Sequence, residues 1–228
     1  MPGLGTAINV ATIVVGTGVG LLVGGRLPER ARTTVLQSVG LIVVALGVGQ
    51  AIRTRNIVFP LVAIVAGGLL GEALRIEERL ESLGDRIRRR VGGEEHTFVE
   101  GFVVASLLFC VGPIAILGSI SDGLENNIGL LVVKSALDGL VSVIFAATLG
   151  WGVGFAALPV LVYQGLLTLL AGRADTVLSD RMILEGAATG GIMVMGIGVR
   201  LLDLKQVRVG SLLPALALAP ALVAAFAR

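Results

Sequence analysis

Cysteine and histidine are almost absent from this chain of 228 residues, which contains one of each. Cys110 cannot form an internal disulfide, and His96 has no second histidine or cysteine near it in the sequence. Thiol chemistry and a metal centre are therefore poorly supported, and we expect no cofactor. The chain also lacks a Walker motif, a Ser-His-Asp set and a Cys-x-x-Cys motif, so we expect no enzyme, although composition leaves catalysis by carboxylates alone open.

Charged residues are scarce as well, at 15% of the chain, whereas a soluble domain has about 25%. Hydrophobic residues make up 55%, aromatic residues only 4%, and there are 33 glycines. Apolar segments rich in glycine suit the close packing of helices in lipid. The composition predicts an integral membrane protein whose partner is the lipid bilayer, and the small net charge of +2 does not indicate nucleic-acid binding.

Apolar segments of the length needed to cross a membrane, roughly 20 residues, recur along the whole chain. They predict an all-α polytopic membrane protein with seven or eight spans in a single transmembrane domain over residues 1–228. Gly150-Trp-Gly152 joins the fifth and sixth segments so tightly that it marks either a hairpin or one long broken helix. The predicted spans are 4–25, 35–52, 57–74, 98–120, 129–150, 152–171, 183–202 and 209–227.

Residues 75–92 differ from these segments because they are strongly charged. Apolar residues recur there at helical spacing, which predicts an amphipathic helix on the membrane surface. The loops on the same side as this helix carry most of the basic residues, so the positive-inside rule places it in the cytoplasm and both chain ends outside. No basic residues precede the first apolar stretch, which therefore does not resemble a cleaved signal peptide. The apolar positions of the helix are Ile76, Leu80, Leu83 and Ile87.

A faint internal repeat relates predicted spans 1–3 to predicted spans 6–8. Five spans separate the matched starts, so the two copies would have opposite orientations in the membrane, as in many secondary transporters. The alternative is that any two glycine-rich apolar stretches align equally well. The matched segments are 17–26 with 164–173, 36–38 with 184–186, 46–49 with 195–198, and 59–61 with 213–215.

Asp138 lies in the middle of the fifth apolar segment, where an acid costs roughly 2.5–3.5 kcal/mol on insertion scales. Lys134 is four residues earlier and therefore shares its helix face, together with Ser135 and Ser142. One interpretation is a helix that lines a pathway, with Asp138 as an ion or proton site. The other is a structural Lys134–Asp138 pair that joins helices.

The fourth apolar segment contains Gly112-Pro113, which predicts a break in the helix. A break at mid-membrane is tolerated only where protein or water satisfies the freed backbone groups, and such broken helices form substrate sites in many transporters. Beyond the break, Ser119 and Asp122 repeat the pattern of the next segment, since both read Ser-x-x-Asp-Gly-Leu. The alternative is a proline kink of structural value only.

Four further polar residues are weaker candidates. Glu100 and Glu185 each precede a glycine near the start of a span, where an acid can simply face the membrane interface. Tyr163 and Gln164 lie within the sixth segment, where they contact a substrate or bridge helices. Asn9 and Thr168 share that ambiguity.

Several motifs lie in the middle of the chain, at 98–112, 118–124, 134–139, 145–150 and 159–165. They resemble a prokaryotic inner-membrane family of unknown function, catalogued as domain of unknown function 554. The resemblance covers essentially the whole chain. It implies localisation in the inner membrane, and members are described only as candidate membrane transport proteins, without an assigned substrate.

Together these patterns favour a small secondary transporter for an ion or small solute, coupled to a cation or proton. Its site is expected between the broken fourth span and the polar fifth span. Oxygen donors without soft ligands favour a hard cation or a proton, whereas Lys134 leaves an organic anion open. An ion channel and a structural or regulatory membrane protein are the alternatives, and the size of the chain is compatible with a homodimer.

Overall fold

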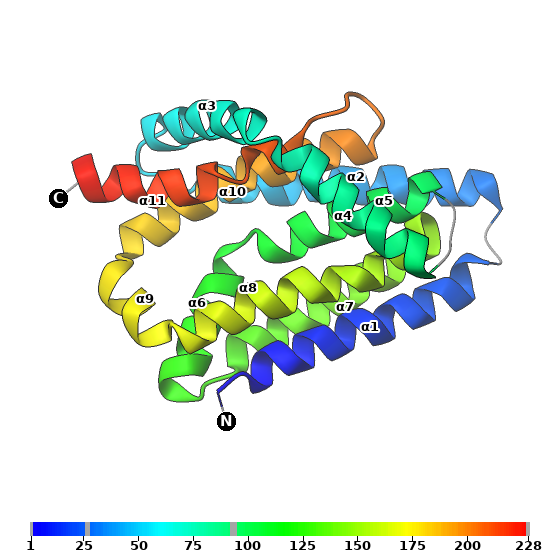
Figure 1. Cartoon of the computed structure of the whole chain (residues 1–228), viewed down its shortest axis with the longest axis horizontal. Helices are drawn as coiled ribbons and strands as arrows, with labels where there is room; N and C mark the ends of the chain where they lie inside the picture. The colour runs from blue at the N-terminus through cyan, green and yellow to red at the C-terminus, as the bar shows by residue number, and fades with distance from the viewer. Residues whose placement is uncertain (1, 26–27, 92–94, 227–228) are drawn as a thin grey trace. The chain divides into compact units, whose positions relative to one another are not determined.

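The computed structural model describes residues 2–25, 28–91 and 95–226, and side chains for all of these except 91, 95–96 and 174–176. Every regular element in these ranges is a helix (Figure 1), which confirms the predicted all-α class. Six helical segments are long and apolar enough to span a membrane, and two bent helix pairs raise the number to eight. The six are α1 (Leu4–Gly24), α2 (Glu29–Ala51), α7 (Gly129–Leu149), η1 with α8 (Trp151–Ala156 and Ala157–Leu169), α10 (Asp180–Leu201), and η2 with α11 (Val209–Leu212 and Ala215–Phe226).

The two bent pairs explain why the number of spans is six to eight. One pair is α5 (Glu95–Cys110) and α6 (Pro113–Glu125), which meet at an angle of 61° across the predicted break. The other is α3 (Val58–Ala73) and α4 (Ile76–Val91), which are separated at Arg75, where φ is 52°. A helix, α4, is therefore formed at the predicted position, while its place on the membrane surface and in the cytoplasm stays a prediction.

Several helix boundaries differ from the sequence-based ranges, and the start of α2 differs most. The second helix begins at Glu29, where an acidic residue in the first turn complements the positive end of the helix. The predicted start at 35 counted only apolar residues and so missed this polar first turn. A short helix, α9 (Ala171–Val177), follows α8 and was not predicted.

Close helix packing through glycine organises the first of two compact units, which comprises residues 1–36, 81–110 and 114–177. There α1 lies along α7 (Figure 1). A Cβ added at Gly16, Gly20 or Gly24 would lie 2.3–2.5 Å from a backbone carbonyl oxygen of α7. These glycines recur every fourth residue, so a single seam of α1 has no side chains and the two backbones approach closely, as expected for helices in lipid.

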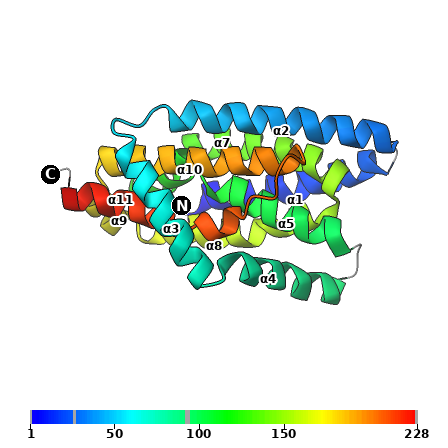
Figure 2. The same ribbon diagram turned by 90° about the horizontal axis from the view of Figure 1, so that it is seen from above.

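The second compact unit comprises residues 37–80, 111–113 and 178–228. Within it α11 packs against α3 and α10 (Figure 2). Close helix packing through glycine also occurs here, because a Cβ at Gly47 would lie 2.6 Å from the carbonyl oxygen of Gly191 on α10. The predictions of a single domain and of an inverted repeat both stay predictions.

Ion pairs tie the end of α3 and the start of α4 to the end of α10 and the following loop, all within the second unit. Arg200 donates to Glu77 over 3.1 Å, and Arg208 pairs with both Glu72 and Glu78. The hydrogen bond to Glu78 raises the pKa of the Arg208 guanidinium above its already high ordinary value, so this cation stays charged.

The outward faces of the spanning helices are apolar. Val15 and Leu22 of α1 are 65% and 77% exposed, and Leu41 of α2 and Leu69 of α3 are 62% and 70% exposed. Large apolar side chains exposed along whole helices would be unfavourable in water. They are the surface expected of helices that face lipid, in agreement with the prediction of a polytopic membrane protein.

Candidate functional site

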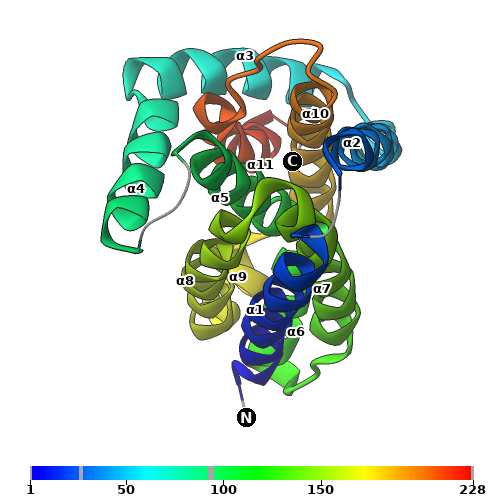
Figure 3. The same ribbon diagram turned by 90° about the vertical axis from the view of Figure 1, so that its right-hand side faces the viewer.

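The buried face of α7 carries the polar residues that the sequence singles out. Lys134, Ser135, Asp138 and Ser142 are each at most 9% exposed. Their spacing of three to four residues places them on one side of the helix, and that side packs against α1. Helix α1 contacts both α7 and α8 (Figure 3), and the burial of these side chains shows that the polar face is turned to the interior of the first unit.

Asp138 is the centre of a hydrogen-bonded network that crosses three spanning helices. Its Oδ2 atom accepts from the Lys134 ammonium group on α7 and, over 3.0 Å, from the Asn9 amide on α1. The same Asn9 amide nitrogen also donates to Oε1 of Gln164 on α8 over 3.3 Å. We call Lys134, Asp138, Asn9 and Gln164 the central network.

Several atoms of this region have no hydrogen-bond partner among the described residues. They include Oδ1 of Asn9 and Nε2 of Gln164, although both residues are fully buried. Oδ1 of Asp138 also accepts no hydrogen bond within the described residues. Buried polar groups are nearly always paired with protein or water. The central network therefore has unused donors and acceptors with which it can bind a further polar group.

Asp122 on α6 interacts with the N-terminal end of α1. Its Oδ2 atom accepts from the backbone N–H groups of Gly3 and Gly5, over 3.1 and 3.2 Å. A carboxylate at this position satisfies N–H groups that have no partner within the helix and complements its dipole. Gly5 also lets α1 approach α7 closely, because a Cβ there would lie 2.5 Å from the Leu131 side chain. Asp122 therefore has a structural role that its sequence pattern does not reveal.

A second set of unpaired atoms accompanies Asp122. Its Oδ1 atom and Oγ of Ser119 are buried and have no partner among the described residues. The same holds for the hydroxyl groups of Thr6 on α1 and Thr168 on α8. The two acids contact α1 through residues only one helical turn apart, Gly5 and Asn9. They thus lie at successive levels along one helix, about 6 Å apart in its axial direction.

The serines of α7 use their protons within the helix. Ser135 donates to the carbonyl oxygen of Leu131 over 2.6 Å, and Ser142 donates to that of Asp138 over 2.7 Å. Such bonds to the preceding turn satisfy a hydroxyl group inside an apolar helix. These two hydroxyls can still accept a hydrogen bond or contact a cation through oxygen, but they have no proton to donate.

The predicted helix break lies between α5 and α6. Helix α5 ends at Cys110 and α6 begins at Pro113, with Gly112 between them. The Cys110 thiol is near enough to Lys134 and Asp138 to interact with them electrostatically, and near enough to Tyr163 as well. Tyr163 is half-buried on α8. Gly112 and Pro113 themselves belong to the second compact unit.

Two further predicted acids, Glu100 and Glu185, lie on α5 and α10. Glu100 is half-buried on α5. Glu185 belongs to the second unit, where it is fully buried and accepts from the Thr54 hydroxyl over 2.5 Å and the Arg55 N–H over 3.0 Å. Glu185 thereby anchors the chain between α2 and α3. The side chain of His96 lies outside the described residues.

Comparison with known proteins places the chain in a family. The family model described as "Protein of unknown function (DUF554)" matches residues 4–224. The chain belongs to the DUF554 family. The resemblance inferred from the sequence motifs is therefore confirmed.

Two relatives of this DUF554 protein are aligned over almost their full lengths. The "Uncharacterized membrane protein YdfK" of Bacillus subtilis (strain 168) is 28% identical over 223 residues, covering 96% of this chain and 95% of the relative. The "Uncharacterized protein YqgA" of Escherichia coli (strain K12) is 29% identical over 230 residues, covering 98% and 97%. No solved structure matches the chain significantly. Together with the apolar helices, the name of the first relative supports a multi-pass membrane protein.

Asn9 is the residue whose importance the sequence understated. Among the described residues, it links Asp138 to α8 through one amide group. The available signal was a single asparagine inside an apolar helix of 21 residues, where an amide needs polar partners.

Proposed function

We propose that this protein is a small secondary transporter for an ion or small solute, coupled to a cation or proton that binds at Asp138. The observation that carries the proposal is the central network, in which a charged pair and two amide side chains are buried across three spanning helices. Ionisable residues inside a membrane are expensive and are typical of ion pathways and proton relays.

The incomplete hydrogen bonding of the central network favours transport over a purely structural role in holding the helices together. A purely structural network is most stable when every buried polar atom is satisfied, yet Asn9 and Gln164 each retain an unpaired atom. A coupling cation that approached Asp138 would compete with Lys134 for the same carboxylate. Binding would then release the ammonium group, and this exchange gives the site two states that a transport cycle can use.

The broken helix supports the same function. Cys110, the last residue of α5, lies in the electrostatic range of both members of the charged pair. A helix that ends near an ionisable pair leaves backbone carbonyl groups free to bind a cation. Ser119 and Asp122 on the continuation of that helix provide further oxygen atoms that have no hydrogen-bond partner among the described residues.

Flux measurements on the reconstituted protein test the proposal. The full chain is placed in liposomes loaded with a pH-sensitive dye, and gradients of H⁺, Na⁺ and K⁺ are applied with and without a mixture of bacterial metabolites. We expect a solute-dependent flux that Asp138→Asn abolishes. Asp203→Asn is the matched control, because Asp203 is exposed in the loop after α10.

The same preparation separates the alternatives. Discrete conductance steps in a planar bilayer, without saturation by solute, would instead identify a channel. Absence of any flux from a correctly folded protein, combined with a large loss of stability in Asp138→Asn, would identify the network as a structural device and contradict transport.

Localisation in the inner membrane with both termini outside, and assembly as a homodimer, complete the proposal. Labelling of single cysteines placed at the chain ends of a Cys110→Ser variant in intact cells tests the orientation. Light scattering of the purified protein in detergent gives the number of copies.

A further inference from the structure

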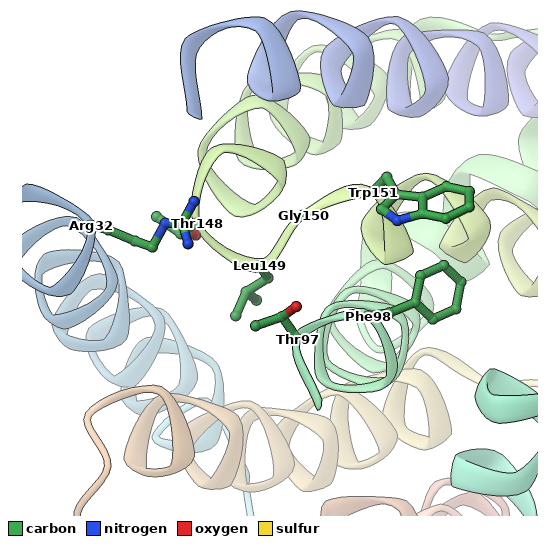
Figure 4. A pocket seen from close by; sticks show the side chains of 7 residues that line it. All are labelled: Arg32, Thr97, Phe98, Thr148, Leu149, Gly150 and Trp151. Atoms are coloured by element: carbon green, nitrogen blue, oxygen red, sulfur yellow. The ribbon is translucent and has the colours of Figure 1, made fainter. Parts of the chain in front are cut away.

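A pocket of about 300 Å³ lies in the first unit, where α7 ends and η1 begins. Figure 4 shows Arg32 extending toward the end of α7, with Trp151 and Phe98 farther along the pocket and Thr97 between. None of these residues belongs to the central network. A volume of this size is at the small end of the range for ligand pockets, so it suits a compact group.

Arg32 is the only charged residue among the described residues that line the pocket. Its guanidinium group has no hydrogen-bond or ion-pair partner within the described part of the chain, and its Nε atom is buried from solvent. Arg32 as a whole is half-buried, and a polar atom that is shielded from water without a partner is costly. The pocket therefore presents an uncompensated positive charge to whatever enters it.

The other polar groups of the pocket divide into donors and acceptors. The hydroxyl of Thr97 and the indole N–H of Trp151 make no hydrogen bond to described residues, so both are available to donate. The Thr148 hydroxyl is not, because it already donates to the carbonyl oxygens of Ile144 and Phe145, over 3.0 and 3.1 Å. A guanidinium group with two neutral donors is a set that recognises an oxyanion.

Aromatic packing holds Trp151 in its place at the pocket. Its ring lies edge to face against Phe98, with ring centroids 5.1 Å apart, and also against Phe155, at 5.7 Å. Leu149 ends one spanning segment and Trp151 begins the next. The pocket therefore lies where spans meet the membrane surface, which is the level of lipid phosphates and of interfacial tryptophans.

We propose that this pocket binds a phosphate group, with Arg32 as its anchor and with Thr97 and Trp151 as additional donors. The phosphate belongs either to the headgroup of an anionic phospholipid or to a soluble phosphate. This site is independent of the transport proposal, since it shares no residue with the central network.

One structural role of Arg32 competes with phosphate binding. The C-terminal end of α7 carries partial negative charge, and a cation there stabilises a helix without any ligand. The two roles differ in a measurable way. Phosphate binding makes stability depend on the added ligand, whereas a helix-capping arginine contributes equally with and without it.

Ligand-dependent stability of the full chain in neutral detergent tests the site. In one arm of the experiment, inorganic phosphate is titrated. In the other arm, phosphatidylglycerol is added, with zwitterionic phosphatidylcholine as its control, and lipid binding is followed by native mass spectrometry. We expect Arg32→Gln to raise the dissociation constant at least about tenfold, as loss of a charged hydrogen bond implies. Thr97→Val should raise it by a smaller factor and tests the site independently if Arg32→Gln folds poorly.

Arg30→Gln is the matched control, because Arg30 precedes Arg32 by two residues, is exposed and does not line the pocket. Equal weakening by Arg30→Gln and Arg32→Gln would overturn the site in favour of general attraction to basic residues. Absence of a ligand-dependent shift for the unmodified chain with both inorganic phosphate and phosphatidylglycerol would also overturn it. Binding of inorganic phosphate supports the site and identifies a soluble phosphate as its ligand. Binding of phosphatidylglycerol without binding of inorganic phosphate supports the site and identifies a lipid headgroup as its ligand.

Discussion

Replacement of Lys134 by methionine would test the energetic basis of the central network. Methionine keeps the length of the side chain and removes its charge, which leaves the Asp138 carboxylate buried without its cation. The two side chains are only 8% and 12% exposed, and removal of one partner from such a pair costs about 3–5 kcal/mol. Asn9 still donates to the carboxylate over 3.0 Å, so we expect a loss near the lower end, about 3 kcal/mol.

The double variant Lys134→Met with Asp138→Leu provides the decisive comparison. It removes both charges, so no unpaired ion remains, and only the Asn9 amide loses a partner. We expect it to cost about 1–2 kcal/mol, less than Lys134→Met alone. Reversible unfolding in mixed micelles with increasing sodium dodecyl sulfate, followed by circular dichroism, measures the free energy of unfolding of the unmodified chain, of Lys134→Met, of Asp138→Leu and of the double variant. If the losses of unfolding free energy in the two single variants add up to the loss in the double variant, the buried pair is refuted. A loss below about 1 kcal/mol in Lys134→Met would also refute it.

Three other predictions concern stability and use the same unfolding assay unless another is named. Gly20→Val should lower the free energy of unfolding by about 1–3 kcal/mol, because a Cβ would lie 2.3 Å from the Val143 carbonyl oxygen. Gly18→Val is the control and should be nearly neutral, because a Cβ there has no atom within 4 Å. Equal costs for the two variants would contradict the packing of α1 on α7. Asp122→Ala should cost about 1–2 kcal/mol and speed amide hydrogen exchange at the start of α1, where unchanged exchange would argue against its capping role. Glu185→Ala removes the acceptor for the Thr54 hydroxyl and the Arg55 N–H, so limited proteolysis should cut the loop between α2 and α3 faster, and an unchanged rate would contradict its anchoring role.

Much of the fold was predictable because membrane insertion depends on local composition. A long apolar segment must become a helix in lipid, where only a helix satisfies all its own backbone groups. The break at Gly112-Pro113 was equally local, since proline cannot donate the required hydrogen bond. The polar first turn of α2 was missed because the prediction counted apolar residues only. At a helix end, a charged residue that complements the helix dipole also stabilises the helix and so extends its boundary.

The candidate site was predictable only in part. The shared face of Lys134 and Asp138 follows from helical periodicity alone, and their ion pair is formed within one helix. The role of Asp122 at the end of α1 could not be predicted, because it joins residues 117 and more positions apart in the chain. The pocket at Arg32 went unrecognised for the same reason, since its lining comes from three separate segments.

The sequence alone therefore determined the class of the protein, the approximate position of its spans and the polar face of α7, because these depend on the energy of each residue in lipid and on the period of one helix. The tertiary structure decided which partners those polar groups have. Asn9 meets Asp138, Asp122 meets the start of α1, and Glu185 meets the chain before α3. Contacts of this kind depend on how separate helices pack, and the glycine seam that brings α1 against α7 sets the geometry of the Asn9–Asp138 contact.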